Sequence, residues 1–178
     1  MKSETLNILL VEENQQNIDL IGKYLSESVS TDWNLTTANR LVDGLGVLSL
    51  QPIDIVLMAY DLPDSMETAG IKLVQEHKPS IPVVILVEEG YSNNEIDFIE
   101  TGAQDYLLMD SYDPILLDKT LHLAITRQKL MTEYKKAIDE LNARIEDLEK
   151  MNDLMVNREI VITNLKRELR DIQKKIIP

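Results

Sequence analysis

Apolar runs and amphipathic stretches alternate along the first 112 residues of the chain. The apolar runs, each of which predicts a strand, are residues 6–11, 33–38, 53–58, 83–87 and 106–109. Three of these runs are almost wholly apolar, which is typical of strands that a parallel sheet buries on both faces. The stretches with helical spacing lie between the runs, at residues 15–28, 41–50, 69–77 and 95–101.

Strands that alternate with helices in this way predict an α/β fold. Five such units favour a flavodoxin-like (βα)5 doubly wound parallel sheet, because crossovers between parallel strands are right-handed and leave few other topologies. In an open sheet of this kind the ligand site lies at the carboxyl ends of the strands. The residues that directly follow each strand are therefore the candidates for a functional site.

Beyond Asp113 the pattern predicts one long helix. Asp113 suits an N-cap and Pro114 the first helical position, and neither glycine nor proline follows until Pro178. Such a helix of about 65 residues would be roughly 98 Å long at ~1.5 Å per residue. Its first part has the spacing to pack on the sheet. We therefore expect a domain at residues 1–128 and a dimerisation helix at residues 129–178, continuous with the fifth helix of the domain.

The distal part of this helix carries a heptad pattern, which predicts a coiled coil. A phase shift of three residues near residues 148–151 reconciles its early and late halves, and a buried Asn152 would favour a dimer in fixed alignment. We predict a homodimer through a parallel coiled coil, and antiparallel packing of the helix is the alternative. The predicted core residues are Ile138, Leu141, Ile145, Leu148, Asn152, Met155, Ile162, Leu165, Leu169, Ile172 and Ile176.

Charge and composition exclude several classes of protein. Residues 1–112 carry 19 acidic and 5 basic side chains, whereas residues 113–178 carry 12 acidic and 13 basic ones. Because an acidic body repels phosphates, we expect no nucleic-acid partner. The chain has no cysteine, so it has no thiolate metal site, and no apolar run approaches the ~20 residues that cross a bilayer. We expect a cytoplasmic protein without a membrane partner.

The candidate site residues can be read from the ends of the strands. Glu12 and Glu13 follow the first strand, Ala59 the third, Val87 lies at the end of the fourth, and Met109 ends the fifth. Position 59 therefore offers only a methyl group at the carboxyl end of the third strand. Glycine-rich phosphate loops, Ser-His-Asp arrangements and zinc-ligand spacings are all absent from the sequence.

These segments, with the Asp61-Leu62-Pro63 stretch and the Gly102–Leu107 stretch, resemble the receiver domain of two-component response regulators. The resemblance covers roughly residues 5–130. It implies that the acidic pair binds magnesium together with a phosphate-accepting aspartate at position 59. It also implies a hydroxyl at position 87 and a lysine at position 109 that contact the phosphoryl group. Tyr106 matches an aromatic residue that moves with this hydroxyl as the switch.

The chain departs from the family at three of these positions. Ala59 has no oxygen, so it can neither form an acyl phosphate nor bind a metal ion. Val87 cannot hydrogen-bond, and Met109 lacks the charge of a lysine. We therefore predict a degenerate phosphoacceptor site, without catalytic residues, a cofactor or a functional metal ion. Glu12, Glu13 and Asp61 would remain as an acidic pocket, where weak Mg²⁺ binding at the glutamate pair is not expected to matter.

Three further residues have competing interpretations. Asp61 is either a displaced phosphate acceptor or a solvent-facing loop acid, and the frame set by Pro63 favours the loop acid. Tyr106, with Tyr112 nearby, could anchor a partner protein or pack into the core. The two interpretations of the tyrosines stay open on sequence grounds.

The leading hypothesis is a non-catalytic signalling adaptor, a phosphorylation-independent pseudo-receiver that binds a partner protein and dimerises through its coiled coil. The alternative is a regulator still switched by phosphorylation at another acid, such as Asp61 or Asp64, or by a small ligand in the vacated pocket. An antitermination-type regulator with RNA-binding helices is a third hypothesis, and we expect no such module because the chain ends within the heptads. An enzyme is the least favoured hypothesis.

Overall fold

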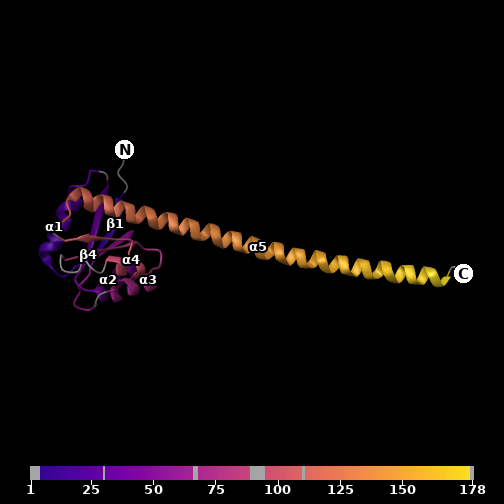
Figure 1. Cartoon of the computed structure of the whole chain (residues 1–178). Coiled ribbons are helices and arrows are strands. Elements are labelled where there is room, and N and C mark those ends of the chain that lie inside the picture. The colour runs from indigo at the N-terminus through magenta and orange to yellow at the C-terminus, as the bar shows by residue number, and fades with distance from the viewer. Residues whose placement is uncertain (1–4, 30, 66–67, 89–94, 110, 177–178) are drawn as a thin grey trace. The chain divides into compact units, whose positions relative to one another are not determined.

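The computed structural model describes residues 5–29, 31–65, 68–88, 95–109 and 111–176. Within these ranges five strands alternate with five helices (Figure 1). The strands are β1 (Thr5–Val11), β2 (Asp32–Ala38), β3 (Ile55–Ala59), β4 (Val83–Val87) and β5 (Asp105–Leu108). The helices are α1 (Gln15–Ser26), α2 (Leu41–Leu50), α3 (Ala69–His77), α4 (Glu95–Thr101) and α5 (Pro114–Ile176).

The five strands form one parallel sheet in the order β2-β1-β3-β4-β5. This order confirms the predicted flavodoxin-like α/β fold with a long C-terminal helix. The chain order reverses beside β1, so the ends of β1 and β3 flank the crevice in which such folds bind ligands. The predicted range of β4 matches the observed one, and the other predicted strand ends differ by at most two residues; the largest difference is at β3, which begins at Ile55 rather than at residue 53.

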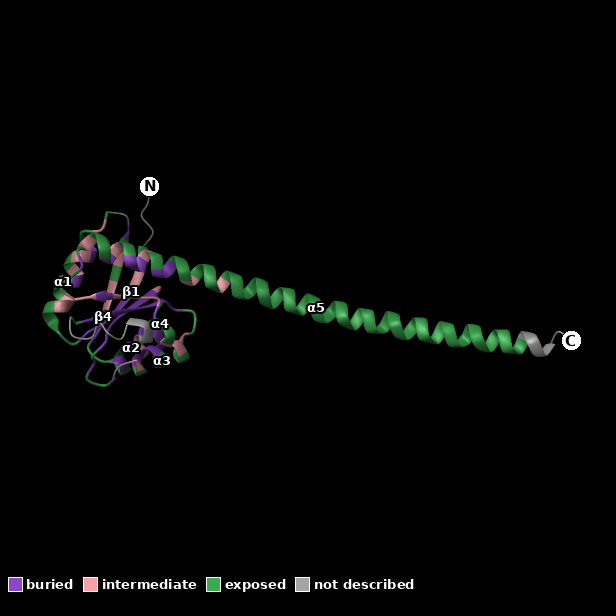
Figure 2. Cartoon of the chain, in the orientation of Figure 1, coloured by how far each residue is buried: buried purple, intermediate pink, exposed green. Residues whose placement is uncertain are grey.

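Two hydrophobic clusters hold the sheet, one on each face. Helices α2, α3 and α4 contribute to the cluster that contains Val56 and Met58, whereas α1 and the start of α5 contribute to the cluster that contains Ile55 and Leu57. Successive side chains of a strand point to opposite faces. Because both faces are covered, every residue of β3 and β4 is buried, which explains why their sequences are continuous apolar runs (Figure 2).

Helix α5 has two parts with different surroundings. In the first part Leu117, Leu121 and Ala124 are fully buried in the cluster beside α1. The chain divides into two units, Met1–Thr132 and Glu133–Pro178. All side chains of residues 133–172 are exposed; this is the green stretch of α5 in Figure 2. We call residues 133–178 the tail.

The predicted coiled coil requires a second helix from another chain, so it remains a prediction. Ten of its eleven core residues lie in the described, exposed part of the tail, and the side chain of Ile176 lies outside the described residues. The predicted domain boundary at residue 128 likewise stays a prediction. None of the helices described in the structure contains a stretch long and apolar enough to span a membrane.

Candidate functional site: a pocket at the carboxyl ends of the strands

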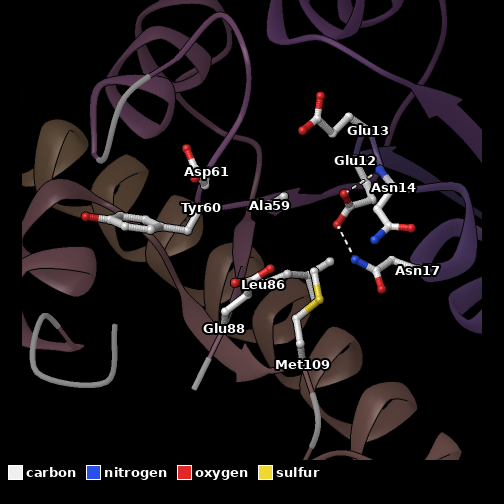
Figure 3. A pocket seen from close by; sticks show the side chains of 10 residues that line it. All are labelled: Glu12, Glu13, Asn14, Asn17, Ala59, Tyr60, Asp61, Leu86, Glu88 and Met109. Carbon is white, nitrogen blue, oxygen red and sulfur yellow. Dashed lines mark hydrogen bonds between the residues drawn. The ribbon is translucent and has the colours of Figure 1, made fainter. Parts of the chain in front are cut away.

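A pocket of about 130 Å³ lies at the carboxyl ends of β1 and β3 (Figure 3). Its position is the crevice that the strand order creates. It brings together five of the predicted site residues, which lie at or just beyond the carboxyl ends of three strands. The lining residues are Glu12, Glu13, Asn14, Asn17, Ala59, Tyr60, Asp61, Leu86, Glu88 and Met109.

The carboxylate of Glu12 accepts hydrogen bonds from residues that directly follow β1. Glu12 is only 3% exposed. One of its oxygens accepts a hydrogen bond from the Asn14 N–H at 2.8 Å, and the other accepts one from the Asn17 side chain at 3.2 Å (Figure 3). Asn14 in turn caps α1 by accepting from the Gln16 N–H. A buried carboxylate needs such donors, so Glu12 orients the start of α1.

The floor of the pocket is apolar where a phosphate-binding site would be polar. Ala59 is the last residue of β3, is 5% exposed, and pairs with Leu86 of β4. Met109 reaches the pocket from the end of β5, where its N–H donates to the Val87 carbonyl. Neither Ala59 nor Met109 supplies a charge or a strong hydrogen-bonding group. The oxygens of a phosphoryl group in this pocket would therefore find no hydrogen-bond donor or positive charge on the side of Ala59 and Met109.

Val87 does not line the pocket. It is fully buried in the core cluster that α2, α3 and α4 cover, while its neighbours Leu86 and Glu88 face the pocket. Position 87 is thus occupied by a side chain that belongs to the core. We expected Val87 beside Ala59 and Met109 because it lies at the end of β4. The alternation of side chains along β4 instead turns Val87 into the core.

The remaining acids surround the pocket without forming a metal cluster. Glu13, Asp61 and Glu88 are exposed at the rim. Among the described residues, no group of three or more His, Asp or Glu side chains is arranged to hold a metal ion. Magnesium requires near-octahedral oxygen coordination at about 2.1 Å, and the side chain of Ala59, which lines the pocket, has no oxygen to contribute.

The model of the response regulator receiver domain matches residues 8–121 of this sequence. The chain belongs to the response regulator receiver domain family. A crystal structure of a receiver domain protein from Clostridium thermocellum has the same fold, with a TM-score of 0.62 and 23% identity. That alignment covers 71% of this chain and 98% of the other.

Two curated relatives are similar to most of this chain. The chain is 26% identical over 157 residues to "Probable cyclic di-GMP phosphodiesterase" from Vibrio cholerae serotype O1, covering 84% of this chain and 34% of that protein. It is 27% identical over 170 residues to "Transcriptional regulatory protein YdfI" from Bacillus subtilis, covering 95% of this chain and 71% of that protein. The chain thus spans only about a third of the Vibrio relative.

The two predicted aromatic residues of this receiver domain lie away from the pocket. Tyr106 is half-buried, with its ring centroid 6.2 Å from that of Phe98. Tyr112 is buried on the opposite face of the sheet and meets Tyr24 edge-on at 5.9 Å. Both nevertheless line a groove of about 400 Å³ between β5 and α5. Each tyrosine packs against the core and also lines this groove. A role of either one in partner binding stays a prediction.

Asp64 has a structural role that sequence reasoning missed. Its carboxylate accepts hydrogen bonds from the Leu41 and Val42 N–H groups at 2.9 and 3.0 Å, and so caps α2, for which Arg40 provides no side-chain cap. Desolvation raises the pKa of Asp64, but the bonds from Val42 and Leu41 and the nearby Arg40 outweigh it, so the pKa lies below its usual value. These contacts occupy both oxygens of an acid that was a candidate phosphate acceptor.

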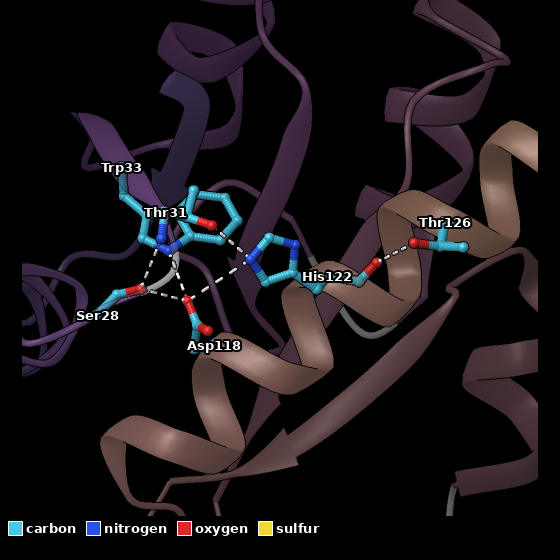
Figure 4. Close-up of polar contacts among 6 residues, drawn as sticks. All are labelled: Ser28, Thr31, Trp33, Asp118, His122 and Thr126. Atoms are coloured by element: carbon cyan, nitrogen blue, oxygen red, sulfur yellow. Dashed lines mark hydrogen bonds and ion pairs between the residues drawn. The ribbon is translucent and has the colours of Figure 1, made fainter. Parts of the chain in front are cut away.

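A polar cluster joins α5 to residues that follow α1 and to the start of β2 (Figure 4). Asp118 accepts hydrogen bonds from the Ser28 hydroxyl at 2.8 Å and from the Trp33 indole N–H at 2.9 Å. His122, one turn along α5, contacts the Thr31 hydroxyl at 2.6 Å and lies 3.9 Å from Asp118. The cluster fixes the first part of α5 against the receiver domain. Its contacts join residues up to 91 apart in the sequence, so the local sequence pattern does not predict the cluster.

Proposed function

We propose that this receiver domain is a pseudo-receiver that signals without being phosphorylated. It would be a non-enzymatic adaptor that binds a partner protein and forms a homodimer through its tail. The observation that carries the proposal is the apolar pocket floor made by Ala59 and Met109. Phosphoryl transfer depends on a nucleophilic oxygen and on cationic groups around the transferred oxygens, and neither is present at these positions.

We propose no cofactor, no functional metal ion and no nucleic-acid partner. The two oxygens of Glu12 are held by Asn14 and Asn17, so a metal ion would have to displace these donors. Weak Mg²⁺ binding at Glu12 and Glu13 would carry no signal without a third oxygen ligand from position 59. Lys and Arg are scarce in the acidic domain, which disfavours phosphate backbones.

The tail supports the dimer part of the proposal. Long helices are rarely stable in water without packing of an apolar face, and the tail exposes such a face along its whole described length. Burying one Leu or Ile side chain contributes roughly 1.5–3 kcal/mol. Several such residues per chain would therefore offset the cost of ordering the helices. A second copy of the chain supplies the same apolar face.

Three polar residues of the tail favour parallel pairing. In the early heptad register Ile138 and Ile145 are a residues, so Arg144 is a g residue and Glu149 is the next e residue. In a parallel coiled coil these positions meet between chains, so Arg144 would pair with Glu149 of the other chain. Asn152 would occupy an a position and meet its counterpart, which fixes the alignment at some cost in stability.

A regulator that is still switched is the competing proposal. It is favoured by Asp61, which is exposed and lines the pocket, and by a volume of about 130 Å³ that would admit only a small ligand. Asp64 supports this alternative poorly, because both of its oxygens are held by the N-terminus of α2.

A beryllofluoride titration with Mg²⁺, followed by NMR of backbone amides, separates the two proposals. The pseudo-receiver predicts no saturable shifts at Glu12, Glu13 or Asp61. Saturable shifts at these residues that vanish in an Asp61→Asn variant would overturn it in favour of the switch. Acetyl phosphate with mass detection provides the covalent counterpart, for which we expect no added phosphate.

Because the chain has no cysteine, single cysteines test the parallel dimer directly. Ile145→Cys at the predicted a position should form a disulfide-linked dimer on mild oxidation, since equivalent a residues face each other at bonding distance. Ala143→Cys, on the outer side of the same turn, is the matched control and should cross-link poorly. Equal cross-linking of both variants, or of neither in a chain that sediments as a dimer, would contradict parallel pairing.

A further inference from the structure

The central block of the tail, residues 151–165, is apolar on more sides than a two-stranded coiled coil can cover. Between Asp153 and Lys166 the only charged residues are Arg158 and Glu159. The block exposes eight large apolar side chains. They are Met151, Leu154, Met155, Val156, Ile160, Val161, Ile162 and Leu165.

The positions of these side chains follow from the helical repeat. Met155 and Ile162, seven residues apart, lie on the predicted dimer seam. Leu154 and Val161 share a second line, offset from the seam by one residue and so by about 100° around the helix. Val156 lies about 100° away on the other side. The seam is thus flanked by apolar side chains on both sides, and Leu154 is 71% exposed.

A parallel dimer leaves both flanks uncovered, because its seam is narrow. By two-fold symmetry, the flank with Leu154 and Val161 of one helix lies beside the flank with Val156 of the other. Each broad side of the dimer would then carry an apolar band at the central block. An exposed apolar band wider than the seam is typical of a surface that packs against a further partner.

The charge of the tail indicates which partner fits. Residues 133–153 carry seven acidic and four basic side chains, whereas residues 154–178 carry three acidic and six basic ones. The first half is therefore negative by three charges and the second half positive by three. A second dimer laid antiparallel over the central block would place each acidic half beside a basic half. The parallel dimer itself brings like halves together, so an antiparallel second dimer offsets that repulsion, whereas a parallel overlay would add to it.

We propose that the central block joins two dimers of this chain, antiparallel to each other, into an assembly of at least four chains. This inference rests on the proposed parallel dimer and adds a second interface to it. The interface would use Leu154 and Val161 from one helix and Val156 from its partner in the dimer. It would assemble the receiver domains in larger numbers than the dimer alone.

Sedimentation velocity of the full chain across the micromolar range tests the proposal. We expect a tetramer or a larger even-numbered assembly, which the double variant Leu154→Gln with Val161→Gln reduces to a dimer. Glutamine keeps a high helix propensity, so circular dichroism should show unchanged helix content. Asn157→Gln with Asn164→Gln has the same spacing on another side of the helix, and this control should leave the assembly intact.

Cross-linking between two single-cysteine chains tests the orientation. Glu146 and Arg170 are 24 residues apart, which is roughly 36 Å along a helix, so a short cross-linker cannot join them within a parallel dimer. We expect a mixture of Glu146→Cys and Arg170→Cys chains to cross-link in species larger than a dimer.

The other outcomes each overturn a defined claim. A dimer that never grows, or a tetramer that Leu154→Gln with Val161→Gln leaves intact, overturns the second interface and leaves the proposed dimer standing. A monomer overturns both. A tetramer without the mixed cross-link overturns the antiparallel arrangement, and a mixed cross-link at the mass of a dimer overturns the parallel dimer itself.

Discussion

At the scale of single residues, Ala59 presents only a methyl group in a pocket that has acids around its rim. Ala59→Asp should lower the free energy of unfolding by about 1–3 kcal/mol without Mg²⁺, because it buries a charge beside Glu12 and Asp61. Adding Mg²⁺ should recover much of this loss, since the new oxygen completes a hard-cation site. Thermal unfolding with and without Mg²⁺ measures the effect, and Ala59→Asn, which adds no charge, is the control. No Mg²⁺ effect on Ala59→Asp would show that the pocket lacks more than this carboxylate.

Asp64 is the residue whose titration should matter to stability. Asp64→Ala removes the cap of α2 and should cost about 1 kcal/mol at neutral pH, as lost helix caps do. Because the folded-state pKa of Asp64 is lowered, its contribution is present above the unfolded pKa of about 3.9 and is lost as pH falls through the folded value.

Urea unfolding of the parent chain and of Asp64→Ala at several pH values measures the role of Asp64. The difference between the two should shrink toward zero in acid. Asp61→Ala is the matched control, since Asp61 is exposed and no hydrogen bond to it is found within the described residues. A difference that persists below the folded pKa would mean that the Asp64 side chain acts by packing rather than by its charge.

At the scale of elements, helix α2 carries two glycines in different surroundings. A Cβ atom at Gly44 would meet Val11 Cγ2 at 2.9 Å, whereas one at Gly46 would meet nothing within 4 Å. Gly46→Ala should therefore raise the free energy of unfolding by about 0.5–1 kcal/mol, the usual gain in helix propensity. Gly44→Ala should lose this gain to overpacking, which costs about 1–3 kcal/mol. Chemical denaturation of both variants compares their stabilities. Equal stabilisation would mean that the Val11 side chain of β1 can move aside for the added methyl group.

At the scale of the whole molecule, different residues of α5 stabilise the domain and mediate the proposed association of the tail. Leu121→Ala should lower the free energy of unfolding of the domain by about 2–5 kcal/mol, because Leu121 is fully buried. Leu141→Ala should leave the domain unchanged and weaken self-association. Trp33 is the single tryptophan and bonds to Asp118 of α5, so its fluorescence reports the domain, while sedimentation reports association. A loss of domain stability in Leu141→Ala would contradict this division.

Local pattern determined much of the fold. The strands were predictable because parallel strands buried on both faces must be apolar throughout, and α5 because its segment contains no residue that breaks a helix. The atoms missing from the pocket were also visible in the sequence, since Ala59 and Met109 cannot supply groups that their side chains lack. These features depend on a residue and its close neighbours alone.

Only the tertiary structure decided which polar groups are already engaged. The Glu12 oxygens are held by Asn14 and Asn17, and Asp64 caps a helix 22 residues earlier in the chain. Val87 packs into the core rather than lining the pocket. Such contacts depend on where packing brings distant segments together, and sequence periodicity reports which face a side chain is on but not which partner it meets there.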